Sequence, residues 1–407
     1  MTPPRSPRTR SDDPGVDRRS FLQTGTAALA LGPGALAAPG ASAQEAGEAP
    51  KPGGEPEWRN RQDGMAYRRL GRTNLMVSEV VAGGDPITPD NYRHMLRAIE
   101  RGLNYLDMAP AYHDGGTEEA WGKLIKEPSV GRDRVFLATK VSPLNRVRNQ
   151  MYKDAFDKLP AGEQEEIRAR ADEIIERRGV KKPGYFLTYF PGQPDSYDPA
   201  YLRIAMLAEY RDRVEDNAIL RDTIVESLEG SLRRLGTDHV DILMCPHGAD
   251  APEDLDSPAI LDAFKQLKQQ GKVRFLGVTS HNDPAGVLKA AADAGHYDLV
   301  MMAYNVVNGG YVDDAIRHAS DKDLGIIAMK VAMAVATHHT PLQPVPDWRI
   351  QKVQRIVPGD DLKAPQKAYV WALQNPRIAA VISNLWDETY IAENLALAGR
   401  KVELQPA

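Results

Sequence analysis

From about residue 65 onwards, short apolar runs alternate with longer segments whose apolar residues recur every three or four positions. The runs are continuously apolar rather than strictly alternating, which is typical of parallel strands covered on both faces. Eight of them are predicted to be strands: 77–82, 105–108, 135–139, 240–245, 274–278, 299–303, 325–329 and 379–382. The intervening periodic segments are predicted to be amphipathic helices: 91–101, 218–235, 259–270, 284–294, 312–319, 365–374 and 389–398.

Eight strands alternating with helices predict an α/β protein built as a (β/α)8 TIM barrel, here over residues 65–401. The alternative, a doubly wound open sheet, normally carries a G-x-G-x-x-G turn after its first strand. Gly83-Gly84-Asp85-Pro86 stands there instead, which favours the barrel. Residues 142–217 contain no strand candidate, and we interpret them as a long insertion after strand 3. Its aromatic residues indicate an ordered lid or an oligomer contact, and the sequence does not separate the two.

The N-terminal segment has its own composition. Residues 1–19 hold five arginines and no lysine, an apolar stretch follows at 21–38, and Ala41-Ser42-Ala43 is a small-x-small cleavage site. The run D-R-R-S-F-L-Q at 17–23 resembles a twin-arginine export signal. We therefore predict a signal peptide over 1–43, cleaved near Ala43, a flexible leader over 44–64, and an exported, periplasmic protein that uses the twin-arginine machinery. The apolar stretch is too interrupted for a stable membrane span.

Composition narrows the function classes further. The 407 residues are 42% hydrophobic and 26% charged, as in globular proteins. A net charge of -5 gives no reason to expect nucleic acid as a partner. A single cysteine excludes disulfides within the chain and multi-cysteine metal sites. The His338–His339 pair lacks an apparent third ligand, so no metal site is predicted.

Three polar residues gather at the ends of neighbouring predicted strands. Asp107 and Lys140 end strands 2 and 3, and Tyr112 follows in the loop after strand 2. A lysine cation within about 4–6 Å of a phenol stabilises the phenolate and lowers a pKa that is otherwise near 10. Asp107 can supply the carboxylate that a buried lysine needs. The set predicts a proton donor for a carbonyl oxygen, with a structural ion pair beside a rim tyrosine as the alternative.

Several motifs resemble those of the aldo/keto reductase family. They are D-x-A-x-x-Y at 107–112, T-K at 139–140, L-G-R-T-N-L-M-V-S at 70–78 and the helix S-L-E-G-S-L-R-R-L-G at 227–236. The resemblance covers roughly 66–141 and 218–399, and it implies an N-terminal β-hairpin. It also implies hydride transfer between NADP or NAD and a carbonyl or alcohol substrate, with a sugar as one candidate. Tyr112 is then the general acid or base, Lys140 tunes it, Asp107 holds Lys140, and His247 is the fourth catalytic residue.

The resemblance also implies a set of cofactor contacts: Thr279, Ser280, Asn282, Met329, Lys330, Ser383, Asn384, Glu393 and Asn394. The chain departs from the family pattern near several of them. His247 stands six positions after Asp241 instead of five, so a bulge near Pro246 is needed to restore its direction. Met301 and Met329 replace a glutamine and a stacking aromatic residue. No basic residue stands directly after strand 8, so selectivity for NADP is not supported, and Arg400 and Lys401 further along are left as possible contacts for a 2′-phosphate.

Two functions remain open from the sequence. The first is an exported oxidoreductase that holds its cofactor tightly, because no pool of reduced nicotinamide is expected outside the cytoplasm. The alternative is a cofactor-free ligand-binding pseudoenzyme on the same barrel, which the two methionines favour. A barrel hydrolase would need two carboxylates about 5–10 Å apart, and Lys140 already claims Asp107. The expected partner is a small carbonyl or alcohol molecule, and an oligomer is compatible with the insertion.

Overall fold

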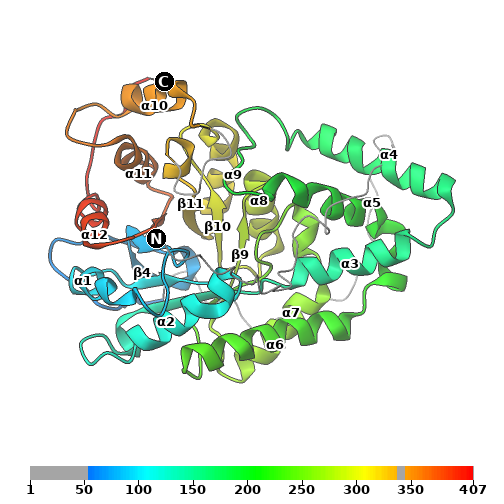
Figure 1. Cartoon of the computed structure of the whole chain (residues 1–407), viewed down its shortest axis with the longest axis horizontal. Coiled ribbons are helices and arrows are strands. Elements are labelled where there is room, and N and C mark those ends of the chain that lie inside the picture. Colours follow the sequence, from blue (N-terminus) through cyan, green and yellow to red (C-terminus); the bar gives the residue numbers. More distant parts are fainter. Residues whose placement is uncertain (1–53, 337–343, 407) are drawn as a thin grey trace, which may run out of the picture.

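The computed structural model describes residues 54–336 and 344–406, so the predicted signal peptide and the His338–His339 pair lie outside the described residues. Eight parallel strands close into one barrel in the order β5-β6-β7-β8-β9-β10-β11-β12 (Figure 1). Their bounds are Val80–Ala82, Tyr105–Asp107, Phe136–Lys140, Ile242–Met244, Phe275–Ser280, Leu299–Ala303, Gly325–Met329 and Ala380–Ser383. The predicted (β/α)8 barrel is confirmed.

Helices cover the outside of the barrel close to the predicted positions. They are α1 (Met95–Glu100), α6 (Asn217–Leu235), α7 (Pro258–Gln269), α8 (Pro284–Ala294), α9 (Gly309–Asp321), α11 (Ala364–Gln374) and α12 (Glu388–Leu395). The ends follow local chemistry. Asp283 caps α8 by accepting from the Gly286 amide, and Gly295 ends it with a φ of 74°. The periodicity did not predict α2 (Gly116–Leu124) or α10 (Asp347–Ile356).

The N-terminal hairpin consists of β3 (Tyr67–Arg69) and β4 (Leu75–Ser78), which pair antiparallel. The apolar run at 77–82, read as one strand, is divided between β4 and β5. The flexible leader also ends earlier than predicted, because β2 (Glu57–Trp58) pairs with β4. Two contacts hold β2: the Trp58 ring lies edge-on to Tyr67 at 5.6 Å, and Glu57 forms an ion pair with Arg274.

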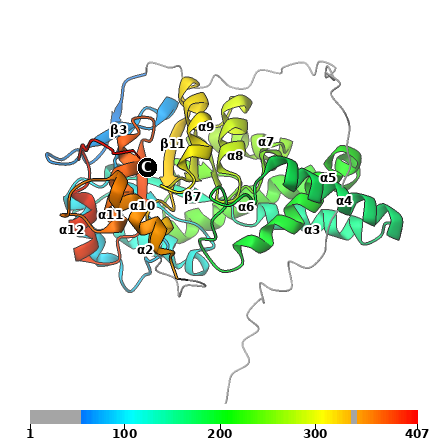
Figure 2. The same ribbon diagram turned by 90° about the horizontal axis from the view of Figure 1, so that it is seen from above.

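The insertion lies between β7 and α6 and contains α3 (Leu144–Phe156), α4 (Ala161–Arg178) and α5 (Tyr197–Val214). In both views these helices extend from one side of the barrel, away from α11 and α12 (Figures 1 and 2). Buried charged pairs fix the base of this arm: Arg203 bonds Asp254 and Asn149, and Arg148 bonds Glu215 at 2.7 Å. The ion pairs are also hydrogen-bonded, which offsets the cost of burying their charges.

The segment between α4 and α5 returns to the carboxyl ends of the barrel strands. Tyr185 donates to Asp283 after β9, and Asn305 after β10 donates to the Tyr189 hydroxyl at 2.8 Å. The insertion thus packs on the rim where barrel enzymes place their sites. Along residues 54–336 and 344–406, no helix is long and apolar enough to cross a membrane.

Candidate active site

The Asp107–Lys140 pair lies inside the barrel at its carboxyl end. Asp107 ends β6 opposite Ala138 of β7, and Lys140 is two residues beyond Ala138 on the same face. The Lys140 Nζ lies 2.6 Å from Asp107 Oδ1 and donates to the Met108 carbonyl at 2.7 Å. Both side chains are almost fully buried. Burial raises the pKa of Asp107 and lowers the pKa of Lys140, and in each case the partner's charge opposes the shift.

Tyr112 begins a tight turn after β6, and its ring lies over this pair. Lys140 Nζ is 4.7 Å from the centroid of the ring. Burial raises the pKa of Tyr112 well above 10, and the carboxylates of Asp107 and Asp85 raise it further. Burial of the phenol therefore outweighs the lowering expected from Lys140, whose charge Asp107 already balances.

His247 stands beside Tyr112 despite its unusual spacing from Asp241. The two rings meet edge to face with centroids 5.9 Å apart, and Nδ1 of His247 lies 2.9 Å from the Ser142 hydroxyl. Burial lowers the pKa of His247 to about 3, and the nearby cations Lys140 and Lys330 act in the same direction. The imidazole is neutral at physiological pH.

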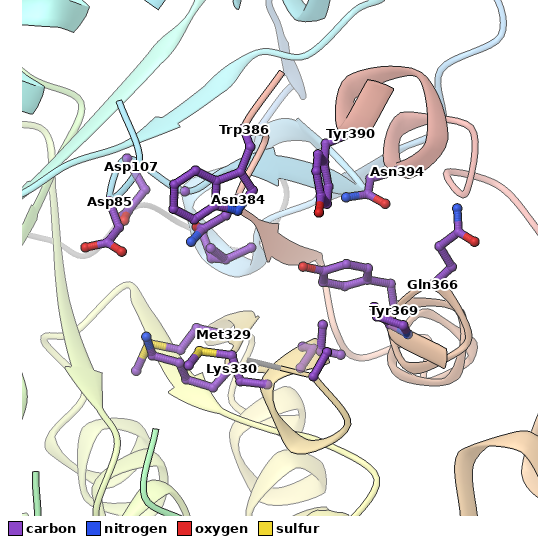
Figure 3. A pocket seen from close by; sticks show the side chains of 18 of the residues that line it. Asp85, Asp107, Met329, Lys330, Gln366, Tyr369, Asn384, Trp386, Tyr390 and Asn394 are labelled. Atoms are coloured by element: carbon purple, nitrogen blue, oxygen red, sulfur yellow. The ribbon is translucent and has the colours of Figure 1, made fainter. Parts of the chain in front are cut away.

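A cavity of about 450 Å³ extends from this cluster along the rim towards α11 and α12 (Figure 3). Seven residues expected from the sequence line it: Asp107, Tyr112, Met329, Lys330, Asn384, Glu393 and Asn394. The aromatic side chains of Tyr369, Trp386 and Tyr390 stand around its middle and far end (Figure 3). The cavity is thus elongated, with the titratable cluster at one end and aromatic and amide groups at the other.

The far end of the cavity is rich in carboxylates and amides. Asn394 donates to the Ser383 hydroxyl at 2.9 Å, and Glu393 forms an ion pair with Lys363 at 2.6 Å. Asp387 caps α12 by accepting from the Thr389 and Tyr390 amides. Arg400, which the sequence left as a possible phosphate contact, pairs with Asp361 and is not part of the lining.

Four expected cofactor contacts are not among the residues that line this cavity: Thr279, Ser280, Asn282 and Ser383, whose hydroxyl accepts from Asn394. Thr279 accepts from the Gly248 amide, and Ser280 donates to the Ala249 carbonyl, so both hydroxyls serve the loop after β8. The Asn282 amide nitrogen donates to Ser196 and to Asp250, at 2.6 and 2.5 Å, and its oxygen accepts from Gln193 at 2.9 Å. The insertion therefore engages the carboxamide that the family pattern assigned to the cofactor.

Sequence reasoning missed other residues that line the cavity: Asp85, His281, Gln366, Tyr369, Trp386 and Tyr390. Two of them could have been found from the sequence. His281 lies between the expected cofactor contacts Ser280 and Asn282, and Asp85 follows a glycine pair after β5. A Cβ on Gly84 would lie 2.2 Å from the Asp107 carbonyl oxygen, so this turn packs directly on β6. The α11 residues had no signal, because only packing brings that helix to the rim.

Comparison with known proteins identifies the family. A model described as the aldo/keto reductase family matches residues 82–213 and 202–405. The chain belongs to the aldo/keto reductase family. This aldo/keto reductase carries the expected oxidoreductase motif residues Asp107, Tyr112 and Lys140 in one cluster.

Its similarity to individual proteins is low. L-galactose dehydrogenase of Arabidopsis thaliana is 24% identical over 361 residues, covering 82% of this chain and 88% of that protein. The chain is 25% identical to the aldo-keto reductase AMT2 of Alternaria alternata but spans only 49% of its length. Aldo-keto reductase AKR11C1 of Bacillus halodurans superposes with a TM-score of 0.54 at 20% identity, covering 83% of this chain and 92% of that one. An aldo/keto reductase of Klebsiella pneumoniae in complex with NADP and acetate gives 0.50 at 18% identity, covering 83% and 92%.

Proposed function

We propose that this aldo/keto reductase transfers hydride between a nicotinamide cofactor and a small carbonyl or alcohol substrate, with Tyr112 as the proton-transfer residue. The observation that carries the proposal is the placement of Tyr112 between Lys140 and His247 at one end of an elongated cavity. A sugar is one candidate substrate.

The chemistry of the cavity lining suits a dinucleotide. Its volume of about 450 Å³ lies within the range usual for small-molecule sites. Tyr390 and Trp386 offer ring faces for a purine, and Asn394 offers an amide for its polar edge. The nicotinamide, when bound, supplies the hydride. The solved relative with NADP supports the cofactor class. Asp387 and Glu393 oppose a 2′-phosphate, so we expect no selectivity for NADP over NAD.

Tyr112 and its neighbours supply the proton chemistry. Its raised pKa keeps the phenol protonated at neutral pH, as a general acid for carbonyl reduction requires. Lys140, 4.7 Å from the ring centroid, stabilises the tyrosinate left after proton transfer. In the tautomer of His247 in which Nδ1 accepts from the Ser142 hydroxyl, Nε2 carries the hydrogen and can donate it to the substrate oxygen. Oxidation of an alcohol uses the same residues in reverse.

We also propose that the protein is exported by the twin-arginine route and retains its cofactor during turnover. The support is the signal-like segment 1–43 and the expected lack of reduced nicotinamide outside the cytoplasm. A retained cofactor would cycle between two substrates. Mass spectrometry of protein purified from the exported fraction tests this directly, and absence of any bound nicotinamide would refute it.

The decisive test of the activity is Tyr112→Phe with Tyr105→Phe as its matched control. The Tyr105 hydroxyl is buried in the barrel with no hydrogen-bond partner among the described residues, so its removal should leave turnover unchanged. Loss of the general acid should lower kcat by roughly 10²- to 10⁴-fold. The Kd for NADH or NADPH, from fluorescence titration, should stay within about twofold. Unchanged kcat in the Tyr112 variant would refute the assignment.

A cofactor-free binding protein is the second candidate. The observation in its favour is that Met301 and Met329 line the cavity where the family has a polar and an aromatic side chain. The same fluorescence titration separates the two: micromolar binding of NAD(H) or NADP(H) excludes the cofactor-free function.

A further inference from the structure

Lys330, which the family resemblance lists only among the cofactor contacts, places its amino group in the cavity. It directly follows β11 with a φ of 59°, a left-handed conformation that is uncommon outside glycine. Its side chain is half-buried and points into the cavity (Figure 3). Within residues 54–336 and 344–406, Nζ has no hydrogen-bond or ion-pair partner, and its one ring contact is Phe190 at 5.6 Å from the centroid. Three N–H donors therefore lack an acceptor from the described protein.

Phe190 comes from the insertion and helps to build the surroundings of Lys330. Its ring also meets His281 edge to face at 5.2 Å, so the insertion, the loop after β9 and the end of β11 form one wall. Burial lowers the pKa of His281 well below its usual value, which leaves this ring neutral. Lys330 is the basic side chain of this wall; burial lowers its pKa, and the carboxylates of Asp85 and Asp107 oppose that shift.

The opposite wall does not neutralise Lys330 by direct contact. Asp107 is bound to Lys140 at 2.6 Å. Asp85 lies across the cavity from Lys330, and its carboxylate attracts the ammonium without forming an ion pair with it (Figure 3). Lys330 also acts on His247, whose ring touches Tyr112, so an oxyanion bound by Lys330 would lie near the reacting group.

We propose that Lys330 binds a carboxylate of the substrate, so that the enzyme acts on oxo acids or the corresponding hydroxy acids. This inference rests on the proposed function and names its substrate class. A diphosphate oxygen of the cofactor has the same oxyanion chemistry. The position of Lys330 at the Tyr112 end, away from Glu393 and Asn394, favours the substrate. The test below distinguishes the two sources.

The experiment compares succinic semialdehyde with butanal, which have the same chain length and differ in the carboxylate. A hydrogen bond to a charged group should give the wild-type enzyme a kcat/KM roughly 10- to 100-fold higher for the semialdehyde. Lys330→Met should lower kcat/KM for the semialdehyde more than for butanal, by about the factor that separates the two substrates in the wild type, since butanal makes no charged contact. Lys330→Arg should retain most of the preference. Lys268→Met is the matched control, because its Nζ also lies over a phenylalanine ring, at 5.4 Å, on the distant α7.

Two further readouts complete the test. If Lys330→Met weakens NADH or NADPH binding and lowers kcat/KM equally for both aldehydes, Lys330 serves the cofactor diphosphate and the proposal is overturned. Calorimetric titration with succinate and with neutral succinamide measures carboxylate binding without turnover. Binding of succinate alone, lost in Lys330→Met, supports the carboxylate site even if no nicotinamide binds and the proposed oxidoreductase function fails. Equal binding of succinate by wild type and Lys330→Met overturns it.

Discussion

Asn282 fastens the insertion to the rim of the barrel through its side-chain amide. The family pattern assigns its carboxamide to the nicotinamide, whereas the structure uses it to bind the insertion. The side chain makes three hydrogen bonds, to Ser196, Asp250 and Gln193, all at 2.5–2.9 Å. We predict that Asn282→Ala releases the segment between α4 and α5 from the rim and leaves the affinity for the cofactor unchanged.

The size of the destabilisation follows from the buried groups that lose a hydrogen-bond partner in Asn282→Ala. Asp250 loses a donor to its buried carboxylate, and the buried Gln193 amide loses an acceptor. Each unsatisfied buried group costs about 1–3 kcal/mol, while Ser196 keeps its bond to Asp250. The local free energy of opening should fall by about 3 kcal/mol, which corresponds to roughly 100-fold faster amide exchange in residues 180–197.

Hydrogen exchange followed by mass spectrometry measures this opening, and fluorescence titration measures the Kd for NADH and NADPH. Asn91→Ala is a suitable control, because the Asn91 side-chain amide likewise donates and accepts hydrogen bonds, one of each, but lies in an exposed loop. It should leave exchange in 180–197 unchanged. A rise in the cofactor Kd of tenfold or more, with unaltered exchange in the insertion, would refute the structural role and restore the one implied by the family.

Three more predictions concern buried titratable groups. Lys140→Met should lower the free energy of unfolding in urea by about 3–5 kcal/mol, because it leaves the buried Asp107 carboxylate without its partner. Adding Asp107→Leu should recover stability but not activity, and a double variant as unstable as Lys140→Met would contradict this. Because the pKa of Tyr112 is raised and that of His247 is lowered to about 3, kcat for reduction should be constant from pH 6 to 9, and an inflection there would contradict it. Burial and Asp254 raise the pKa of Asp250 to about 7. The protonated Asp250 stabilises the fold at low pH, and this stabilisation should be lost as the pH rises through about 7. In Asp250→Asn the urea midpoint should therefore change less between pH 5 and 8 than in the wild type.

The barrel and its central pair could be predicted because both depend on local patterns. The strand that ends at Asp107 and the strand that ends at Lys140 are adjacent in the chain. Parallel pairing therefore places both side chains at one edge. The predicted strands were wrong where the local hydrophobic pattern is ambiguous or too short. The run 77–82 is apolar on both sides of Ser78 and Glu79, so the hairpin and the first barrel strand looked like one element. The strand β2 has only two residues, too few for any periodicity.

The cofactor contacts after β9 could not be predicted for a different reason. A motif match assigns a residue type to a backbone position, but the partner of its side chain depends on what else reaches that position. Here the insertion supplies Gln193 and Ser196, which lie 89 and 86 residues before Asn282 in the chain and hydrogen-bond its side chain. His281, the residue before it, then lines the cavity together with Phe190 from the same insertion. The same insertion therefore both anchors Asn282 and contributes to the cavity wall beside Lys330. It follows that family members without this insertion should differ at both places together, in the partner of the asparagine and in the wall that Lys330 faces.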